Sequence, residues 1–437
     1  MGVHLLNSTK SWEVGMTTNE LALFGGKPII VEPFKKFNTF GPEEIAAASE
    51  VVSSGILSEF VGSKGEFFLG GKNVRAFEEE WAAYFNVKHA ISVNSWTSGL
   101  NAMVGACGVQ PFDEVITTPW TMSATAMAPL QWNAIPVFAD IDESYNICPI
   151  DVRRKITEKT TAILAADIFG RECAIPELMQ IASEYNLKVI TDTAQAPGVV
   201  TPNGFIGTSS DIGGYSLNYH KHIHTGEGGM IVTNDDALAW NCRLIRNHGE
   251  NLIESGSSYT NIIGQNYRLG EVEAAIGRVQ LKKLAAIVAD RQDKARELIK
   301  RLACYKGIRF NLSQDLSEHA FYVLPFEYDE RDTGVVRSKI ISALEAEGLK
   351  GLAGGYQNLH LLPTFQKKNA YGQRGFPWSM HSREVNYTRG ICPIAENKHE
   401  KSTILFEMCL HELEKNEIEL IDKCFDKVWE NLERLRA

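Results

Sequence analysis

The sequence predicts an α/β protein with a three-layer, mostly parallel seven-stranded sheet and a smaller C-terminal α+β domain. Two observations support this prediction. From residue 88 onward, short β-branched runs alternate with longer segments of helical periodicity, which is the pattern of parallel strands joined by helices that cover both faces of a sheet. After a long helical segment over 270–305, the chain continues with shorter strands and helices that are typical of a second, smaller domain.

The elements follow in order along the chain. Two helices, over 40–55 and 70–87, precede the sheet, and the aromatic face of the second is predicted to lie in the core. Strands are then predicted over 89–95, 114–119, 135–142, 161–169, 187–194, 212–218 and 228–234. The C-terminal region holds a strand over 320–328 and a helix over 335–348. We therefore divide the chain into a flexible tail (1–20), a large α/β domain (21–300) and a small α+β domain (301–437).

Composition and charge restrict the classes of function. The formal net charge of −10 opposes binding to nucleic acid and to anionic membranes, because both depend on basic patches. The eight cysteines form no C-x-x-C pair, so neither a zinc ribbon nor a disulfide framework is indicated. No apolar run reaches the about 18 residues that a membrane helix needs. These features predict a cytoplasmic protein that acts on a small molecule.

Lys221 stands in an unusual setting. The segment SLNYHKHIHTGEGG (216–229) places it in a loop between two predicted strands, flanked by His220 and His222. A lysine that forms a Schiff base must be largely neutral, so its pKa has to fall from about 10.4 through burial or a nearby positive charge, which a protonated His220 or His222 could supply. Two other interpretations stay open. One is a metal site formed by His220, His222 and His224, which would share one face of an extended strand, and the other is a solvated polar loop.

Two further polar clusters lie at the predicted carboxyl ends of strands, where ligands bind in parallel sheets. Asp192 ends an apolar strand, so its carboxylate needs either the N–H groups of a following helix or a protonated heterocyclic nitrogen. Ser95, Thr97 and Ser98 precede a helical segment and form a candidate seat for a phosphate. The glycine motifs of dinucleotide and P-loop sites are absent from the sequence. A lysine, a carboxylate and an anion seat at neighbouring strand ends together indicate pyridoxal phosphate.

Several stretches of the chain resemble the DegT/StrS family of pyridoxal-phosphate-dependent sugar aminotransferases, which have fold type I. The resemblance runs in order from about Gly25 to the C-terminus, over FEEEWAAYFNVKHAISV, DEVITTP, IPVFADID, VITDTAQAPG, YSLNYHKHIHTGEGGMIVTN, RNHG and NYRLGEVEAAIGRVQL. It implies that Lys221 forms the Schiff base with the cofactor. This lysine lies five positions after Ser216 and six before Glu227, which is the spacing of the family.

The same resemblance implies the other contacts of the cofactor. Asp192 would pair with the pyridine nitrogen, and Gln195 would contact the phenolic oxygen. The implied phosphate ligands are Ser216, the turn at Trp96 and Thr97, and Asn266 of the partner subunit. The last of these implies a homodimer that shares its active sites.

Three positions depart from the pattern of the family. Trp96-Thr97 stands where the phosphate turn usually has Gly-Thr, and Asp167 stands where the family commonly has histidine. The aromatic residue expected to stack on the cofactor ring falls on Met122. We expect Met122, through its polarizable sulfur, rather than Trp120 to pack on that ring.

The resemblance implies an aminotransferase that works by a ping-pong mechanism. An amino group would pass from glutamate or glutamine to the cofactor and then to a keto sugar, which is a nucleotide-linked sugar, a sugar acid or a cyclitol, with Lys221 as covalent tether and general base. One subgroup of the family has histidine in place of the lysine and dehydrates sugars, so a dehydratase stays an alternative, as does a non-catalytic cofactor-binding regulator. The candidates for contacts to the acceptor are Arg246, His248, Tyr267, Arg268 and His360.

Overall fold

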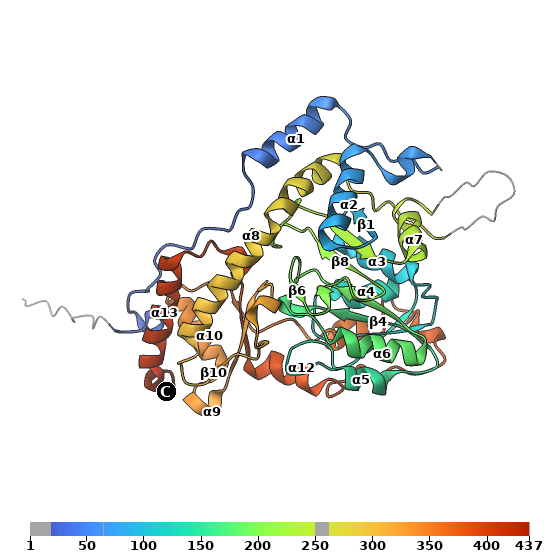
Figure 1. The fold of residues 1–437 in the computed structure, drawn as a ribbon. Helices are drawn as coiled ribbons and strands as arrows, with labels where there is room; N and C mark the ends of the chain where they lie inside the picture. The colour runs from blue at the N-terminus through green and yellow to red at the C-terminus, as the bar shows by residue number, and fades with distance from the viewer. Residues whose placement is uncertain (1–18, 64, 250–261, 437) are drawn as a thin grey trace, which may run out of the picture.

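The computed structural model describes residues 19–63, 65–249 and 262–436. The flexible tail predicted over residues 1–20 lies outside these ranges as far as residue 18. Figure 1 shows a group of elements around a large sheet and a second group near the C-terminus, with the long helix α8 (Glu271–Leu302) running between them.

The large sheet has seven strands in the order β1-β9-β8-β5-β4-β2-β3. Their bounds are β1 (His89–Val93), β2 (Glu114–Thr117), β3 (Ile135–Phe138), β4 (Thr160–Ala166), β5 (Lys188–Asp192), β8 (Ile212–Ser216) and β9 (Gly229–Thr233). β9 runs antiparallel to both of its neighbours, and the other pairings are parallel. The predicted mostly parallel sheet is therefore confirmed.

Helices cover both faces of this sheet. Along β4, Ala162 and Leu164 lie in one core with residues of α3 and α7, while Ile163 and Ala165 lie in the opposite core with residues of α6. This alternation follows from the period of two in a strand. The surrounding helices are α2 (Lys72–Phe85), α3 (Trp96–Ala106), α4 (Ser123–Gln131), α5 (Pro149–Lys155), α6 (Ile175–Tyr185) and α7 (Asp236–Arg246). The shorter elements here are η2 (Glu66–Leu69), η3 (Ile168–Gly170), β6 (Val200–Thr201) and β7 (Gly204–Phe205).

Helix α8 contributes to two hydrophobic cores. Leu281 and Leu284 pack with α2 and with strands of the large sheet, whereas Leu298 and Leu302 pack in the core of the C-terminal elements. Near its start, α8 is also packed against α1 (Pro42–Ser54). No helix within the described ranges is both long enough and apolar enough to cross a membrane.

A smaller antiparallel sheet follows, in the order β10-β11-β13-β12. Its strands are β10 (Ile308–Arg309), β11 (Leu324–Tyr328), β12 (Leu352–Ala353) and β13 (Thr403–Phe406). The helical elements around it are η1 (Ala22–Phe24), η4 (Leu316–Glu318), α9 (Glu330–Thr333), α10 (Arg337–Ala346), η7 (Lys398–Ser402), η8 (Met408–Leu410), α13 (Lys415–Glu430) and α14 (Leu432–Arg436). Leu21 and Ile30 also lie in this core. The domain boundary at residue 300 stays a prediction.

Between β12 and β13 the chain returns to the large sheet. This returning segment (residues 354–397) packs Phe365, Trp378 and Tyr387 into the core around β3 and β4. Glu114, fully buried at the start of β2, accepts hydrogen bonds from His381 Nε2 at 2.8 Å and from Arg383 Nε at 2.9 Å. The segment contains η5 (Leu359–Leu361), α11 (Pro363–Gln366), η6 (Trp378–Met380) and α12 (Pro393–Asn397).

Candidate active site

A cavity of about 170 Å³ opens at the carboxyl ends of strands of the large sheet. Seven residues that the sequence predicts as ligands of a cofactor line it, namely Trp96, Thr97, Met122, Asp192, Gln195, Ser216 and Lys221. They follow β1, β2, β5 and β8, which end on the same edge because the strands are parallel. The topology therefore brings together residues that lie far apart in the sequence. We call this space the cofactor cavity.

Lys221 is buried at the wall of the cofactor cavity. Its side chain lies over the ring of Tyr322, with Nζ 4.1 Å from the ring centroid. Burial lowers the pKa of the amine to about 8, although the negative charge of Asp192 opposes this shift. An amine with this pKa is uncharged in an appreciable fraction of molecules near neutral pH, which a nucleophilic lysine requires.

The flanking histidines do not supply a positive charge. Burial lowers the pKa of His220 to about 4 and that of His222 to about 3, and the charge of Lys221 adds to both shifts. Both rings are therefore neutral at pH 7. The expectation that a protonated histidine lowers the pKa of Lys221 is wrong, because burial is the cause.

The three histidines also point to different partners. His222 donates from Nε2 to the carbonyl oxygen of Ala320 at 2.7 Å, and His220 lines the cofactor cavity. His224 packs against Phe40, with 4.6 Å between the ring centroids and an angle of 32° between the rings. Residues 219–224 form turns and bends instead of an extended strand. Within the part of the chain that the structure describes, no three His, Cys, Asp or Glu side chains form a metal-binding group.

Asp192 ends β5 with both carboxylate oxygens engaged. Trp96 Nε1 donates to Oδ1 at 2.6 Å, and Thr125 Oγ1 donates to Oδ2 at 2.7 Å. The alternative in which Asp192 caps a following helix is wrong, because residues 193–198 form turns. The backbone N–H of Ala194 also donates to Oδ1, at 3.3 Å. The two side-chain donors, from α3 and α4, fix the orientation of the carboxylate, and Oδ2 keeps a lone pair for a further donor.

The start of α3 forms an anion seat beside this carboxylate. Ser95 caps the helix by accepting the N–H of Ser98 at 3.1 Å. Trp96 and Thr97 are the first residues of the helix, so their N–H groups have no partner within it and carry the positive end of its dipole. The hydroxyl of Ser216 lines the same cavity. Such a seat suits a phosphate.

These groups fit pyridoxal phosphate part by part. The buried amine suits its aldehyde, the oriented carboxylate suits its pyridine nitrogen, and the helix N-terminus suits its phosphate. The family model of the DegT/DnrJ/EryC1/StrS aminotransferase family matches residues 20–392. The chain belongs to this family. The protein is thus an aminotransferase that depends on pyridoxal 5′-phosphate, as predicted.

Individual relatives agree with the family. The aminotransferase is 33% identical over 350 residues to the spore coat polysaccharide biosynthesis protein SpsC of Bacillus subtilis. This alignment covers 78% of this chain and 87% of SpsC. It is 31% identical over 318 residues to GDP-perosamine synthase of Vibrio cholerae, covering 70% of this chain and 84% of that one. The X-ray structure of the aminotransferase from Psychrobacter cryohalolentis superposes with a TM-score of 0.77 at 26% identity, over 92% of this chain and 100% of that chain.

Gln195 of the aminotransferase links the cofactor cavity to the start of the returning segment, at Tyr356. Its Oε1 accepts the backbone N–H of Phe169 at 2.8 Å, and its Nε2 donates to the hydroxyl of Tyr356 at 2.9 Å. The second hydrogen on Nε2 is left for a ligand oxygen. The contact to the phenolic oxygen stays a prediction.

Met122 and Trp120 have different surroundings. Met122 lines the cofactor cavity and is 53% exposed. Trp120 is fully buried, donates from Nε1 to the carbonyl oxygen of Tyr356, and packs edge-on against Phe169. Packing of Met122 on the cofactor ring stays a prediction, and the position of Trp120 in the core favours Met122 over it.

Asn266, the eighth predicted ligand, is exposed and does not line the cofactor cavity of its own chain. Its backbone forms a bridge to Asn247, and its carbonyl oxygen accepts a hydrogen bond from Asn94 Nδ2 at 3.3 Å. That Asn266 binds the phosphate of the cofactor in the partner subunit stays a prediction.

Asp167, the departure from the family's histidine, also lines the cofactor cavity. Thr193 Oγ1 donates to its Oδ2 at 2.6 Å, and the N–H of Cys173 donates to its Oδ1 at 2.9 Å. Burial raises the pKa of the carboxyl to about 7 in spite of these bonds. Near neutral pH the side chain is therefore close to the midpoint of its titration.

Three side chains on or beside the site have no signal in the sequence. Thr125, which donates to Asp192, lies inside a helix, and Tyr322 and Tyr356 lie next to strands β11 and β12 of the small sheet. By contrast, two of the residues that the sequence predicts as contacts to the acceptor are buried and paired with acidic side chains in the core. Arg246 is fully buried in an ion pair with Glu78, and His360 is fully buried with Nε2 2.9 Å from Glu396 Oε1.

Proposed function

We propose that the protein transfers an amino group from glutamate or glutamine to a keto sugar in two successive half-reactions at one site. The observation that supports this most is the buried amine of Lys221, with its pKa of about 8, on the same cavity wall as Asp192 and Ser216. A neutral amine is both a nucleophile and a base, and amino transfer needs both.

The residues of this chain would divide the work as follows. Ser216 and the N–H groups that begin α3 would hold the phosphate, and Asp192 would keep the pyridine nitrogen protonated. Lys221 would tether the cofactor covalently and, once displaced by the amino donor, take the proton from the donor's α-carbon. Pyridoxal phosphate, when bound, supplies an electron sink for the charge that this proton leaves behind.

A sugar as acceptor is supported by the names of the relatives, since one is a GDP-perosamine synthase and another acts in polysaccharide biosynthesis. The dehydratase alternative has less support, because the wall of the cavity presents the primary amine of Lys221. His220 also lies on that wall, but its pKa of about 4 leaves it a weak base.

A homodimer in the cytoplasm belongs to the same proposal. The side chain of Asn266 is exposed, with Oδ1 accepting the N–H of Arg268 at 3.4 Å, and the family resemblance gives it a place at the partner's phosphate. Each active site would then be complete only when two chains associate.

Substitution of the lysine tests the proposal. Purified protein is expected to show a visible absorption band from the Schiff base, and Lys221→Ala is expected to abolish both that band and amine transfer. Lys159→Ala, at an exposed position, is the matched control and should leave both unchanged. Addition of glutamate or glutamine should convert the band to that of the aminated cofactor. A band that survives Lys221→Ala, or resists every amino donor, would contradict the proposal.

A further inference from the structure

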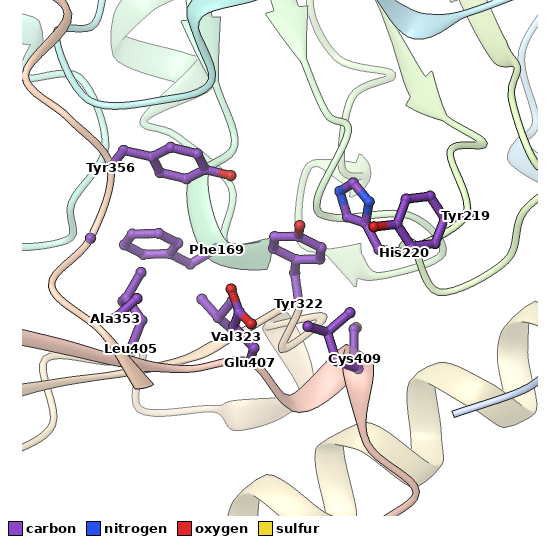
Figure 2. Close-up of a pocket in the computed structure, with 12 residues that line it drawn as sticks. Phe169, Tyr219, His220, Tyr322, Val323, Ala353, Tyr356, Leu405, Glu407 and Cys409 are labelled. Carbon is purple, nitrogen blue, oxygen red and sulfur yellow. The ribbon is translucent and has the colours of Figure 1, made fainter. Parts of the chain in front are cut away.

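A second cavity, of about 290 Å³, lies beside the cofactor cavity, and His220 and Tyr356 line both. We call it the adjoining cavity, and Figure 2 shows the side chains around it. Phe169 comes from the turn after β4, whereas Tyr322, Tyr356 and Glu407 come from segments next to strands of the small sheet. The adjoining cavity thus lies between the two sheets, and Tyr322 on its wall is the ring over which the amine of Lys221 lies.

One wall of the adjoining cavity is a fixed aromatic surface. The rings of Phe169 and Tyr356 are nearly parallel, at 10° with 6.2 Å between their centroids, and both residues are hydrogen-bonded to Gln195. Phe169 has a left-handed backbone conformation, with φ of 59°, which is strained for a residue with a bulky side chain. Such strain is typical of functional sites, and here it presents a flat apolar face that suits a saturated ring.

Glu407 brings a negative charge into this apolar surrounding. In Figure 2 its carboxylate lies between the rings of Phe169 and Tyr322. Glu407 is the one acidic or basic side chain, apart from a neutral histidine, among the described residues that line the cavity. Burial raises the pKa of the carboxyl, and no described group acts in the other direction. A half-buried carboxylate without a partner is costly, so the cavity suits a ligand that donates hydrogen bonds to it.

We propose that the adjoining cavity receives the ring of the acceptor, and that Glu407 selects a ring with hydroxyl groups against a ring with a carboxylate. The inference rests on the proposed function and narrows its substrate class. The aromatic wall would pack on one face of the ring while Glu407 accepts hydrogen bonds from its hydroxyls. Keto pyranoses and keto cyclitols without an acid group on the ring would be substrates, and keto sugar acids would be excluded.

The physical reason for this choice is repulsion between two carboxylates. A carboxylate on the acceptor ring would lie in the same poorly solvated space as Glu407, where two like charges repel each other strongly. We therefore expect discrimination on the order of 100-fold in kcat/KM. Removal of the charge on Glu407 should abolish most of this discrimination between the two kinds of acceptor.

The test compares pairs of acceptors that differ at one group. The holoenzyme is first converted to its aminated form with glutamate or glutamine. It is then given nucleotide-linked keto hexoses and the matching keto hexuronic acids, with UDP, GDP and dTDP as carriers, and kcat and KM are measured for each. Glu407→Gln keeps the shape of the side chain, and Glu412→Gln, at an exposed position, is the matched control. The thermal midpoint of each variant checks that it is folded.

We expect wild type and Glu412→Gln to prefer the neutral ring by on the order of 100-fold. In Glu407→Gln the ratio should fall below about 10-fold, with KM for the neutral acceptor raised more than kcat is lowered. The inference is overturned if wild type uses the acid ring as well as the neutral one, if Glu407→Gln keeps the ratio, or if no neutral ring reacts. A wild type that cannot be aminated by any donor contradicts the proposed function instead.

Discussion

The amine of Lys221 is surrounded by groups that act on its charge in opposite directions. Asp192 and the face of the Tyr322 ring favour the charged form, whereas burial favours the neutral form and dominates. The neutral histidines on either side add no charge of their own. Since burial is set by the fold, the reactivity of the lysine is a property of the folded protein.

The pH dependence of Lys221 follows from this shift. In the cofactor-free protein the amine should react with an acylating reagent along a curve with its midpoint at about pH 8, measured by mass spectrometry of the labelled peptide. In the unfolded chain the midpoint should return to about 10.4. Between these values the unfolded state binds more protons than the folded state, so this group makes the fold more stable as the pH rises from about 8 to 10.4. Equal midpoints in the two states would contradict the assignment.

Trp96 shows how one residue can serve two parts of the site. Its backbone N–H begins the anion seat at α3, and its indole reaches across to Asp192 Oδ1 at 2.6 Å. The sequence predicts Trp96 as part of the phosphate turn, where it departs from the family's glycine, but it does not predict the contact of the indole with Asp192. The indole fits because Gly99, Gly214 and Gly229 leave room around it, and a Cβ at Gly214 would lie 2.7 Å from the ring.

At the scale of elements, Glu114 fastens the returning segment to the large sheet. Its buried carboxylate holds His381 and Arg383 from that segment and also accepts the hydroxyl of Thr157 at 2.7 Å. This contact ties the chain between β12 and β13 to the start of β2. The wall of the adjoining cavity that includes Tyr356 depends on the same segment.

Glu114→Gln is therefore expected to lower the free energy of unfolding by about 1–3 kcal/mol, because it removes a buried carboxylate that accepts hydrogen bonds from both His381 and the cationic Arg383. Denaturant unfolding measures this value, and limited proteolysis should show earlier cleavage within residues 354–397. Glu158→Gln, on an exposed side chain, is the control and should change stability by less than about 0.5 kcal/mol. Identical unfolding of both variants would show that the contact does not hold the segment.

The elements of the large sheet could be predicted because local patterns specify them. Strands buried on both faces appear as short apolar runs, and the residues at their carboxyl ends must share one edge. This pattern predicts that Lys221, Asp192 and Ser216 lie close together, and the three residues line one cavity. The role of Glu407 could not be predicted in this way. It depends on how the small sheet packs beside the large one, and nothing local to residues 403–410 specifies that contact. The same holds for Tyr356. The indole of Trp96 reaches Asp192 through packing within the large sheet, and no local pattern specifies that contact either.

For the whole molecule, the proposed sharing of sites makes a prediction that a single chain cannot satisfy. Lys221→Ala and Asn266→Ala are each expected to be inactive as homodimers. After the two variants are mixed and allowed to exchange subunits, half of the dimers would be mixed, and each would hold one intact site. About a quarter of the wild-type activity should then return. Activity that stays absent after subunit exchange, shown by tagged subunits, would contradict a shared site.

Helix α8 has a consequence for how the two sheets move. It is a continuous helix of 32 residues, on the order of 48 Å long, and its two halves are embedded in different cores. Rotation of one sheet against the other would have to bend this helix or pull one end out of its core. We therefore expect α8 to stay straight and to keep the distance between the two sheets constant. The adjoining cavity would then have its shape before any substrate binds. Substrates would be selected by whether they fit this preformed cavity, and not by a movement of the two sheets that closes around them.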